Sequence, residues 1–352
     1  MKRFSVPASF TDAKKPRISV IIPVRNEERT LPHLLNDLRQ QTYPFDCFEV
    51  IVADDASTDN TLTVIQELVS QLPYSLYPLA LRNEPTFSPK KRAIRQSISL
   101  ATGTLIVTTD GDCRVGPRWL ETIAAFYHQT GARLISGPIS FDPVDSVFGR
   151  LQTVESSSLI GAGASTMKMG FPTMCNGANL TYEKAVFEEV GGFDGIDHVA
   201  SGDDELLMHK IANRYPNGVR FLKSPDAIVQ TPPQASLKAF FHQRKRWASK
   251  WRAYQSIGPS VLAVFIFASN LALPLAVIGF WGFTWSAPQL ILVLALKAVP
   301  EWLFLGSILA FLKKKHLIGW IPATQLVYPL YVVFFGLVAQ QKGFQWKGRS
   351  LR

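Results

Sequence analysis

Three long apolar segments in the last third of the chain constrain its architecture more than any other feature. They cover residues 257–285, 288–312 and 317–340. Each is longer than the roughly 20 residues that a helix needs to cross the hydrocarbon core of a bilayer. With 47% hydrophobic and only 18% charged residues, the composition also departs from that of an ordinary soluble protein. The sequence therefore predicts a membrane region that follows a water-soluble part.

The basic residues are concentrated on both sides of this apolar region. Residues 237–256 contain six Lys and Arg residues and no acid, and residues 342–352 contain four more. Residues 257–341 add a net charge of +3, so the formal net charge of +10 leaves −3 for residues 1–236. Because positive charge beside apolar segments is attracted to anionic lipid headgroups, we expect an anionic membrane surface as a partner, and no nucleic acid.

The three apolar segments can be threaded through a membrane in more than one way. If residues 1–256 are cytoplasmic, the uncharged turn 284–289 lies outside and the lysines at 313–315 lie inside, as the positive-inside rule prefers. Three full spans would then place the basic residues 342–352 outside. Either the rule is broken at this end, or one segment is re-entrant or lies at the membrane interface.

The cysteines and the N-terminal residues bear on the compartment. Cys47, Cys113 and Cys175 form no Cys-x-x-Cys pair and are odd in number, which favours a reducing cytosol over a disulfide framework. The N-terminus has a basic start with no apolar stretch behind it, so we expect no secretory signal. The expected location is the inner (plasma) membrane, crossed more than once, with residues 1–236 in the cytoplasm.

Strand-like and helix-like segments alternate over the first 110 residues. Apolar runs of strand length lie at 17–24, 48–53 and 105–109, and helix-like stretches lie at 30–41, from about 59–61 onward, and at 90–101. This alternation predicts an α/β fold with a largely parallel, doubly wound sheet. Further along the chain we expect strands at 134–136, 220–222 and 227–230, and a helix around 147–161.

Acidic residues follow two of these strands directly. Asp54 and Asp55 end the second strand, and Asp110 and Asp112 flank Gly111 after the strand at 105–109. Ligands bind at the carboxyl edge of an open α/β sheet, and the glycine lets the backbone turn so that both acids face one cation. Such oxygen ligands suit Mg²⁺ or Mn²⁺ bound to a substrate phosphate. An Asp-Gly-Asp turn on the surface is the alternative interpretation, since these are ordinary turn residues.

A second group of acids stands at the head of a short helix. Asp203, Asp204 and Glu205 precede the helical stretch LLMHKI. Acids at a helix N-terminus commonly complement the helix dipole, so residue type alone leaves a structural role and a chemical role equally open.

The basic stretch 237–255 is typical of a helix that lies at a membrane interface. Within it Gln243, Arg246 and Trp247 are spaced i, i+3 and i+4, which places them on one helical face. Anchoring in the lipid headgroup region is the simpler interpretation of this arginine and tryptophan. Lys297 is spaced i, i+4 from Glu301 in the middle apolar segment, so we expect this pair to interact or to face the protein interior.

The order of these motifs resembles that of the membrane-bound family 2 glycosyltransferases, which are inverting enzymes with a GT-A fold. The matching stretches, within residues 17–256, are IIPVRNEE, IVADDASTDNT, TTDGDC, GANLTYEKAVFEEVGGFD, the GDD at 202–204 and the QRKRW at 243–247. The last matches a Gln-x-x-Arg-Trp motif, which cellulose, chitin and hyaluronan synthases and ceramide glucosyltransferases carry just before membrane helices.

The resemblance implies a role for each motif residue. The residues implied at the nucleotide-sugar pocket are Pro23, Arg25, Glu27, Asp55, Lys90 and Asp110, with Gln243, Arg246 and Trp247 closing over the diphosphate and the acceptor. Asp112 would hold the metal, Mg²⁺ or Mn²⁺, with Asp110 contacting the metal or the ribose. Asp204 would be the general base. Asp203 stands where the family usually has Glu, so the two acids remain alternatives for that role.

The implied reaction is an inverting, metal-dependent transfer of a sugar from a nucleotide-sugar donor, with UDP favoured, to an acceptor at the cytoplasmic membrane face. A lipid or lipid-linked acceptor is favoured over processive polysaccharide synthesis, because residues 257–341 offer little material for a polymer channel. A non-catalytic nucleotide-sugar-binding membrane protein is the third possibility, which the retained acids disfavour. The expected domains are a GT-A catalytic domain at 1–236, the interfacial helix at 237–256, the membrane region at 257–341 and a basic tail at 342–352.

Overall fold

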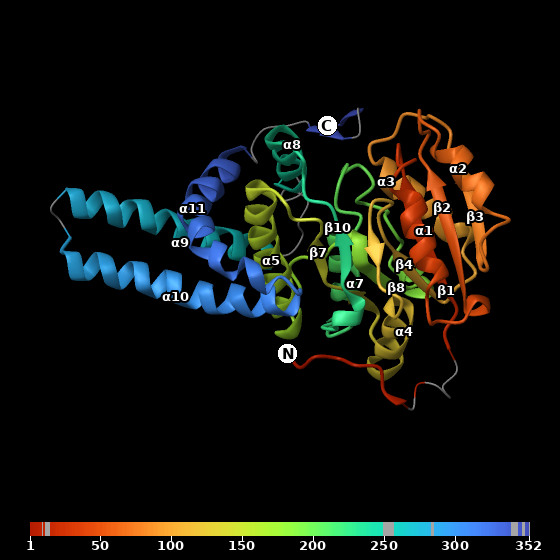
Figure 1. Cartoon of the computed structure of the whole chain (residues 1–352), viewed down its shortest axis with the longest axis horizontal. Helices are drawn as coiled ribbons and strands as arrows, with labels where there is room; N and C mark the ends of the chain where they lie inside the picture. Colours follow the sequence, from red (N-terminus) through yellow and green to blue (C-terminus); the bar gives the residue numbers. More distant parts are fainter. Residues whose placement is uncertain are drawn as a thin grey trace.

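A computed structural model describes residues 1–8, 10, 15–248, 257–282, 285–338, 344–346 and 349–351. An α/β domain occupies one end of the molecule, and a pair of long helices projects from the other (Figure 1). The predicted α/β fold class is confirmed.

The main sheet has seven strands in the order β3-β2-β1-β4-β8-β6-β9. Their bounds are β1 Ile18–Val24, β2 Phe48–Asp54, β3 Ser75–Ala80, β4 Leu105–Thr108, β6 Leu134–Ser136, β8 Leu180–Glu183 and β9 Val219–Phe221. The pairs β1–β2, β1–β4, β2–β3 and β6–β9 are parallel, whereas β8 is antiparallel to both β4 and β6. The sheet is thus largely parallel as predicted, with one reversed strand in its interior.

Two strands of this sheet were not predicted, and each lacks the pattern of a buried strand. β3 contains Pro78 and is mostly exposed, which is tolerated because β3 lies at the edge of the sheet. β8 is only four residues long and runs directly into helix α6, Lys184–Glu189. Its strand conformation depends on pairing with β4 and β6, which are distant in the sequence.

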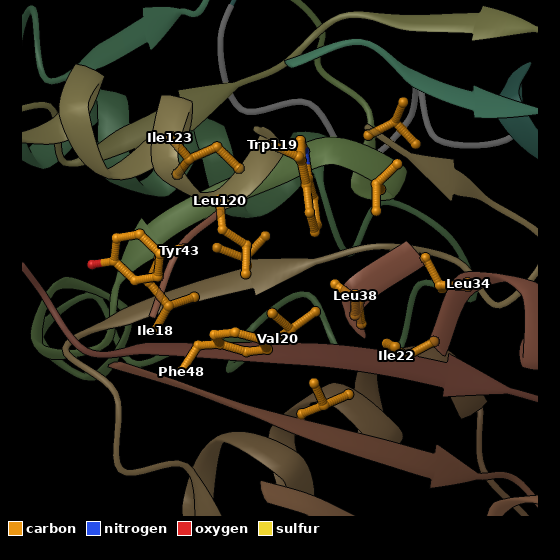
Figure 2. Close-up of a cluster of buried hydrophobic side chains, with 14 of the residues drawn as sticks. Ile18, Val20, Ile22, Leu34, Leu38, Tyr43, Phe48, Trp119, Leu120 and Ile123 are labelled. Carbon is orange, nitrogen blue, oxygen red and sulfur yellow. The ribbon is translucent and has the colours of Figure 1, made fainter. Parts of the chain in front are cut away.

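Both faces of the sheet are covered by helices. Val20 and Ile22 of β1 point to one face, where Leu34 and Leu38 of α1 (Leu31–Arg39) and Trp119 of α4 (Trp119–Thr130) pack on them (Figure 2). Residues of β1 that alternate with these, such as Ile21, point to the other face. The helices there include α3 (Pro89–Leu100) and α7 (Glu205–Arg214). Because both faces are buried, the strand is continuously apolar.

A small second sheet and a long helix complete the side of the domain that faces the apolar helices. The sheet has the order β5-β10-β7, with β5 Arg114–Val115, β7 Ile139–Phe141 and β10 Val229–Thr231. Helix α5, Val147–Lys168, is about two turns longer than predicted. Glycines obscured its length, but Gly161 has a packing role, since a Cβ there would lie 2.6 Å from Cζ of Phe304.

The three apolar segments that the sequence predicts after the domain are helical in the structure. The helices after the domain are α8 Leu237–Ala248, α9 Ile257–Trp281, α10 Ala287–Phe311 and α11 Ile321–Val338, with a 3₁₀ turn at Lys315–Trp320 before α11. Three of them, α9, α10 and the helical stretch Lys315–Phe335, are long and apolar enough to cross a membrane. Lys297 and Glu301 form the predicted ion pair. The remainder of the predicted interfacial helix, residues 249–256, lies outside the described residues, as do parts of the basic tail.

Candidate active site

A cavity of about 710 Å³ lies where the carboxyl ends of the central strands approach α5 and α8. All twelve residues that the resemblance places at the site line it. They are Pro23, Arg25, Glu27, Asp55, Lys90, Asp110, Asp112, Asp203, Asp204, Gln243, Arg246 and Trp247. Residues that are more than 200 positions apart in the chain thus share one site.

The parallel strands bring three of the motifs to one edge. The backbone N–H of Asp55 donates to the carbonyl of Val24 at 2.9 Å, and that of Thr109 donates to the carbonyl of Ile21 at 3.2 Å. These bonds hold the ends of β2 and β4 against β1. Gly111 has no alternative here, because a Cβ would lie 2.7 Å from Cγ1 of Val24.

Asp55 is buried and held by two arginines. Nη2 of Arg92 donates to its Oδ1 at 2.7 Å, and the Asp55 side chain is only 3% exposed. Nη1 of Arg25 donates at 2.5 Å to the backbone carbonyls of both Asp55 and Ala56. Sequence reasoning missed Arg92, whose only signal was its position one helical turn into the basic stretch PKKR. Asp54 has a local role instead, since it accepts from the N–H of Ser57 at 3.2 Å.

Lys90 connects the two acidic motifs. Its Nζ lies 2.7 Å from Oδ1 of Asp110 and 3.4 Å from Oδ2 of Asp203. Burial by itself would lower the pKa of Lys90, but the nearby carboxylates of Asp110, Asp203 and Asp204 outweigh it and raise the pKa above its ordinary value. The lysine is therefore charged at neutral pH.

The adjacent lysine points elsewhere and fixes a loop. Lys91 is buried, and its Nζ donates to the backbone carbonyls of Ile196, Val199 and Ser201 at 2.5, 2.8 and 2.9 Å. That loop leads directly to Asp203. The sequence contained no signal that would separate Lys91 from Lys90, because the distinction rests on which side of α3 meets the loop.

Asp203 and Asp204 have different surroundings. Asp203 pairs with Lys90, whereas Asp204 is the N-cap of α7 and accepts from the backbone N–H of Glu205 at 2.7 Å. The other carboxylate oxygen of Asp204 accepts from the N–H of Gly177 at 3.0 Å. Two backbone donors thus fix the orientation of Asp204 at the cavity, while Asp203 is joined to the Asp110 side of the site.

Helix α8 contributes one face to the cavity, and Arg244 beside that face is buried in the protein. Gln243, Arg246 and Trp247 line the cavity, and Oε1 of Gln243 is buried without a hydrogen bond from any described residue. Buried acceptors are normally satisfied, so this oxygen suits a donor from a bound molecule. Arg244 does not line the cavity and is only 4% exposed.

Arg244 forms an ion pair with Glu155 of α5, and sequence reasoning missed both residues. The Arg244 guanidinium also lies over the rings of Trp247 and Phe240, with centroid distances of 4.1 and 4.6 Å. The hydroxyl of Tyr331 in α11 donates to Glu155 Oε1 at 3.2 Å. Burial raises the pKa of Glu155, and Arg244 lowers it only in part. The signal in the sequence was a lone acid inside a helix of small and apolar residues.

The remaining wall of the cavity is largely apolar, and it too was not predicted. Leu159, Ile160 and Ala164 of α5 line it, together with Ile139 and Phe141 of β7. The cavity therefore has a charged side at the strand ends and an apolar side at α5, the helix that contacts α10 and α11.

The donor set fits a metal ion that is shared with a ligand. Within the described residues no group of three or more His, Cys, Asp or Glu side chains could hold a metal by itself. Asp110 and Asp112 supply two carboxylates at the cavity. Mg²⁺ typically uses one or two carboxylates, several waters and substrate phosphates, so these two residues suffice only when a phosphate ligand is present.

Comparison with known proteins agrees with the fold. Residues 19–191 match the family model described as Glycosyl transferase family 2. Glycosyltransferase AglE of Haloferax volcanii is 29% identical over 200 residues, which are 54% of this chain and 59% of that protein. Beta-monoglucosyldiacylglycerol synthase of Nostoc sp. is 23% identical over 235 residues, which are 66% of this chain and 48% of that protein. The chain thus spans about half the length of these relatives.

Among solved structures, the mannosyltransferase PcManGT from Pyrobaculum calidifontis, in complex with GDP-Man and Mn²⁺, has a TM-score of 0.58. It is 22% identical, and the match covers 90% of this chain and 88% of that chain. At this identity the likeness establishes the fold. The chain therefore contains a glycosyl transferase family 2 domain with a GT-A fold, followed by three long apolar helices.

Proposed function

We propose that this protein is an inverting, metal-dependent glycosyltransferase that moves a sugar from a nucleotide-sugar donor, with UDP favoured, to a lipid or lipid-linked acceptor at the cytoplasmic face of a membrane. The observation that carries the proposal is the convergence of Asp55, Asp110, Asp112, Asp204 and the cavity face of α8 on one cavity. The names of the relatives support the reaction class.

In the proposed site the nucleotide lies at the strand ends. Asp55 accepts hydrogen bonds from the base or ribose in an orientation set by Arg92, with Pro23, Arg25 and Glu27 beside it. Lys90 and Arg246 place positive charge near the diphosphate. Asp112 and Asp110 would hold Mg²⁺ or Mn²⁺, which neutralises charge that develops on the leaving diphosphate. The complex of PcManGT with Mn²⁺ and GDP-Man is consistent with such an arrangement.

Asp204 is the proposed general base. It takes the proton of the acceptor hydroxyl as that oxygen attacks the anomeric carbon from the face opposite the diphosphate. The N–H groups of Glu205 and Gly177 hold the carboxylate in place for this step, whereas Asp203 is paired with Lys90. This difference in partners supports Asp204 over Asp203.

The apolar wall of the cavity and the adjoining membrane helices support a lipid-bearing acceptor. Leu159, Ile160 and Ala164 of α5 line the cavity. Helix α5 also contacts α10 and α11, so it lies between the cavity and the proposed membrane region. One relative is a monoglucosyldiacylglycerol synthase, which by its name makes a glycolipid. A processive polysaccharide synthase is the alternative, and product size separates the two.

The test is a donor screen with the purified full-length chain, a lipid extract and Mn²⁺ or Mg²⁺, followed by mass spectrometry of the products. We expect one lipid product whose mass increases by a single sugar, with loss of turnover in EDTA. Polymeric product would favour the processive alternative, and absence of turnover with every donor that binds would favour a non-catalytic protein.

Asp204→Asn tests the base in the same assay. We expect turnover to fall by about 10² to 10⁴ while the donor still binds, because only proton transfer is removed. Asp145→Asn, at an exposed carboxylate outside the cavity, is the matched control and should leave turnover unchanged. Full turnover in Asp204→Asn would contradict the assignment, and Asp203→Asn would then be the variant to measure.

A further inference from the structure

Helix α11 has one side against the catalytic domain and one side exposed. Ile321 is buried in a cluster with Val154 of α5, and the Tyr331 ring packs against Phe240 of α8 with a centroid distance of 5.9 Å. Phe335 also packs on Phe240, at 6.3 Å. Helix α11 therefore contacts α5 of the domain at its first residue and α8 further along its length.

The other side of α11 carries an exposed apolar stripe. Its members are Leu326, Val327, Leu330 and Phe334, which are 81%, 55%, 68% and 52% exposed. They are spaced i, i+1, i+4 and i+8, so they share one helical face. Large apolar side chains are rarely gathered on a surface unless a partner or a membrane covers them.

The pair α9 and α10 is arranged differently. These two helices form a hairpin that projects from the molecule, while α11 runs across the base of the hairpin beside α5 (Figure 1). Each has 25 residues, about 38 Å of helix, which exceeds the roughly 30 Å of a hydrocarbon core. Exposed apolar residues such as Val264, Ile278 and Leu296 occur along the hairpin.

The charged segments are placed consistently with this difference. Lys314, at the end of α10, forms an ion pair with Asp142 of the domain at 2.6 Å, so the lysines at 313–315 lie on the domain's side. Strand β11, Phe344–Trp346, lies against α8 and within the basic tail (Figure 1). The C-terminal end of α9 and the N-terminal end of α10 lie at the far end of the hairpin (Figure 1), and no charged residue stands between them in the sequence.

We propose that α9 and α10 cross the bilayer, whereas α11 lies in the membrane interface with its exposed stripe against the lipid acyl chains. Residues 344–351 then lie on the same side of the membrane as the catalytic domain, which satisfies the positive-inside rule for every basic segment. The partner of the stripe is lipid, because the stripe adjoins a hairpin whose exposed large side chains are mostly apolar. This inference concerns topology and is independent of the proposed reaction.

The test is the labelling of single cysteines in sealed vesicles with a membrane-impermeant maleimide. Cys47→Ser and Cys175→Ser remove the partly exposed thiols, and Cys113 is fully buried. Three variants in this background report on the domain, the hairpin turn and the tail: Ser99→Cys, Ala287→Cys and Ser350→Cys. We expect Ser99→Cys and Ser350→Cys to react from one side and Ala287→Cys from the other. Labelling of Ser350→Cys together with Ala287→Cys would overturn the proposal in favour of three spans.

A second measurement avoids the cysteine substitutions. A protease-cleavable tag after Arg352 on the otherwise unchanged chain should be removed in the same vesicles in which Cys47 of the domain is labelled. Protection of the tag in those vesicles would overturn the proposal. Neither readout depends on turnover, so failure of the topology is distinguishable from failure of the proposed function.

Discussion

The carboxylates of the site differ in their hydrogen-bond donors, and these donors decide the role of each. Asp55 meets Arg92, Asp203 meets Lys90, and Asp204 meets two backbone N–H groups. Glu49 on β2 belongs to none of the motifs, yet its side chain is fully buried. It accepts from Ser19 Oγ and from the N–H of Thr102, both at 2.6 Å, so it fastens the loop before β4 to the sheet.

Glu49 should make the folded state sensitive to acid. Burial by itself would raise the pKa of Glu49, but the hydrogen bonds from Ser19 and Thr102 and the charge of Arg17 outweigh it and lower the pKa. A lowered pKa contributes stability above the ordinary glutamate value of about 4.3, and this stability is lost as pH falls through the folded value. Thermal unfolding of the full chain in detergent, followed by tryptophan fluorescence from about pH 6 to pH 3, measures the effect.

We expect Glu49→Gln to unfold at a lower temperature near neutral pH and to lose less further stability than the unmodified chain below about pH 4.3. Glu67→Gln, at an exposed position of α2 (Thr61–Leu68), is the control and should follow the unmodified chain. Parallel pH profiles for Glu49→Gln and the unmodified chain would show that this carboxylate does not supply the acid sensitivity.

At the level of elements, α8 is held between the cavity and the apolar helix α11. Trp247 lines the cavity, and the guanidinium of Arg244 lies over its ring. Arg244 is in turn bound to Glu155 of α5, which also accepts from Tyr331 of α11. Three helices that are distant in the sequence thus meet at one buried ion pair.

Arg244→Ala should therefore affect both stability and turnover. Removing one partner leaves a buried, uncompensated carboxylate, which costs about 3–5 kcal/mol. We expect a lower unfolding temperature and a lower kcat with a smaller change in the KM for the donor, because Trp247 loses its support. Lys245→Ala removes the same charge from the next residue of α8 and should have little effect on either.

The double variant Glu155→Leu with Arg244→Met separates the two effects. Replacing both partners of a buried pair with apolar residues is often neutral for stability, so the unfolding temperature should recover. If Arg244 positions Trp247, kcat should remain low in the double variant. Recovery of kcat together with stability would mean that Arg244 acts on folding only.

At the scale of the whole molecule, the domain and the helical hairpin form a direct interface. Gly161 of α5 allows Phe304 and Ile308 of α10 to approach closely, and Lys314 binds Asp142 nearby. Arg150 also lies over the ring of Trp320, at 5.2 Å. The domain thus contacts the apolar helical region through side chains, in addition to being covalently connected to it.

Gly161→Leu should disturb this interface between α5 and α10. A side chain at residue 161 would meet Phe304 at less than van der Waals distance, and overpacking of this kind typically costs about 1–3 kcal/mol. We expect faster proteolysis at the junction and a lower unfolding temperature in detergent. Gly319→Leu is the control, since a Cβ there meets nothing within 4 Å. Equal stability of the two variants would argue against the interface.

The sequence by itself determined the features that depend on local pattern. Alternating apolar runs and amphipathic stretches specified the parallel core of the sheet, and the length of the apolar segments specified the membrane helices. Residues directly after strands, such as Asp55 and Asp110, could be placed at the carboxyl edge because parallel strands end at the same edge. That all twelve candidate residues line one cavity follows from this topology together with the position of α8.

Only the tertiary structure decided which side chains meet across long sequence distances. The sequence does not distinguish Lys90 from Lys91, or Arg244 from its basic neighbours, because the partner of each is set by the packing of α3 and α8. The same holds for β8, which is a strand only between β4 and β6, and for α11, whose apolar composition equals that of a spanning helix. The composition of a segment shows how much apolar surface it can bury. Its neighbours in the fold determine which surface it packs on.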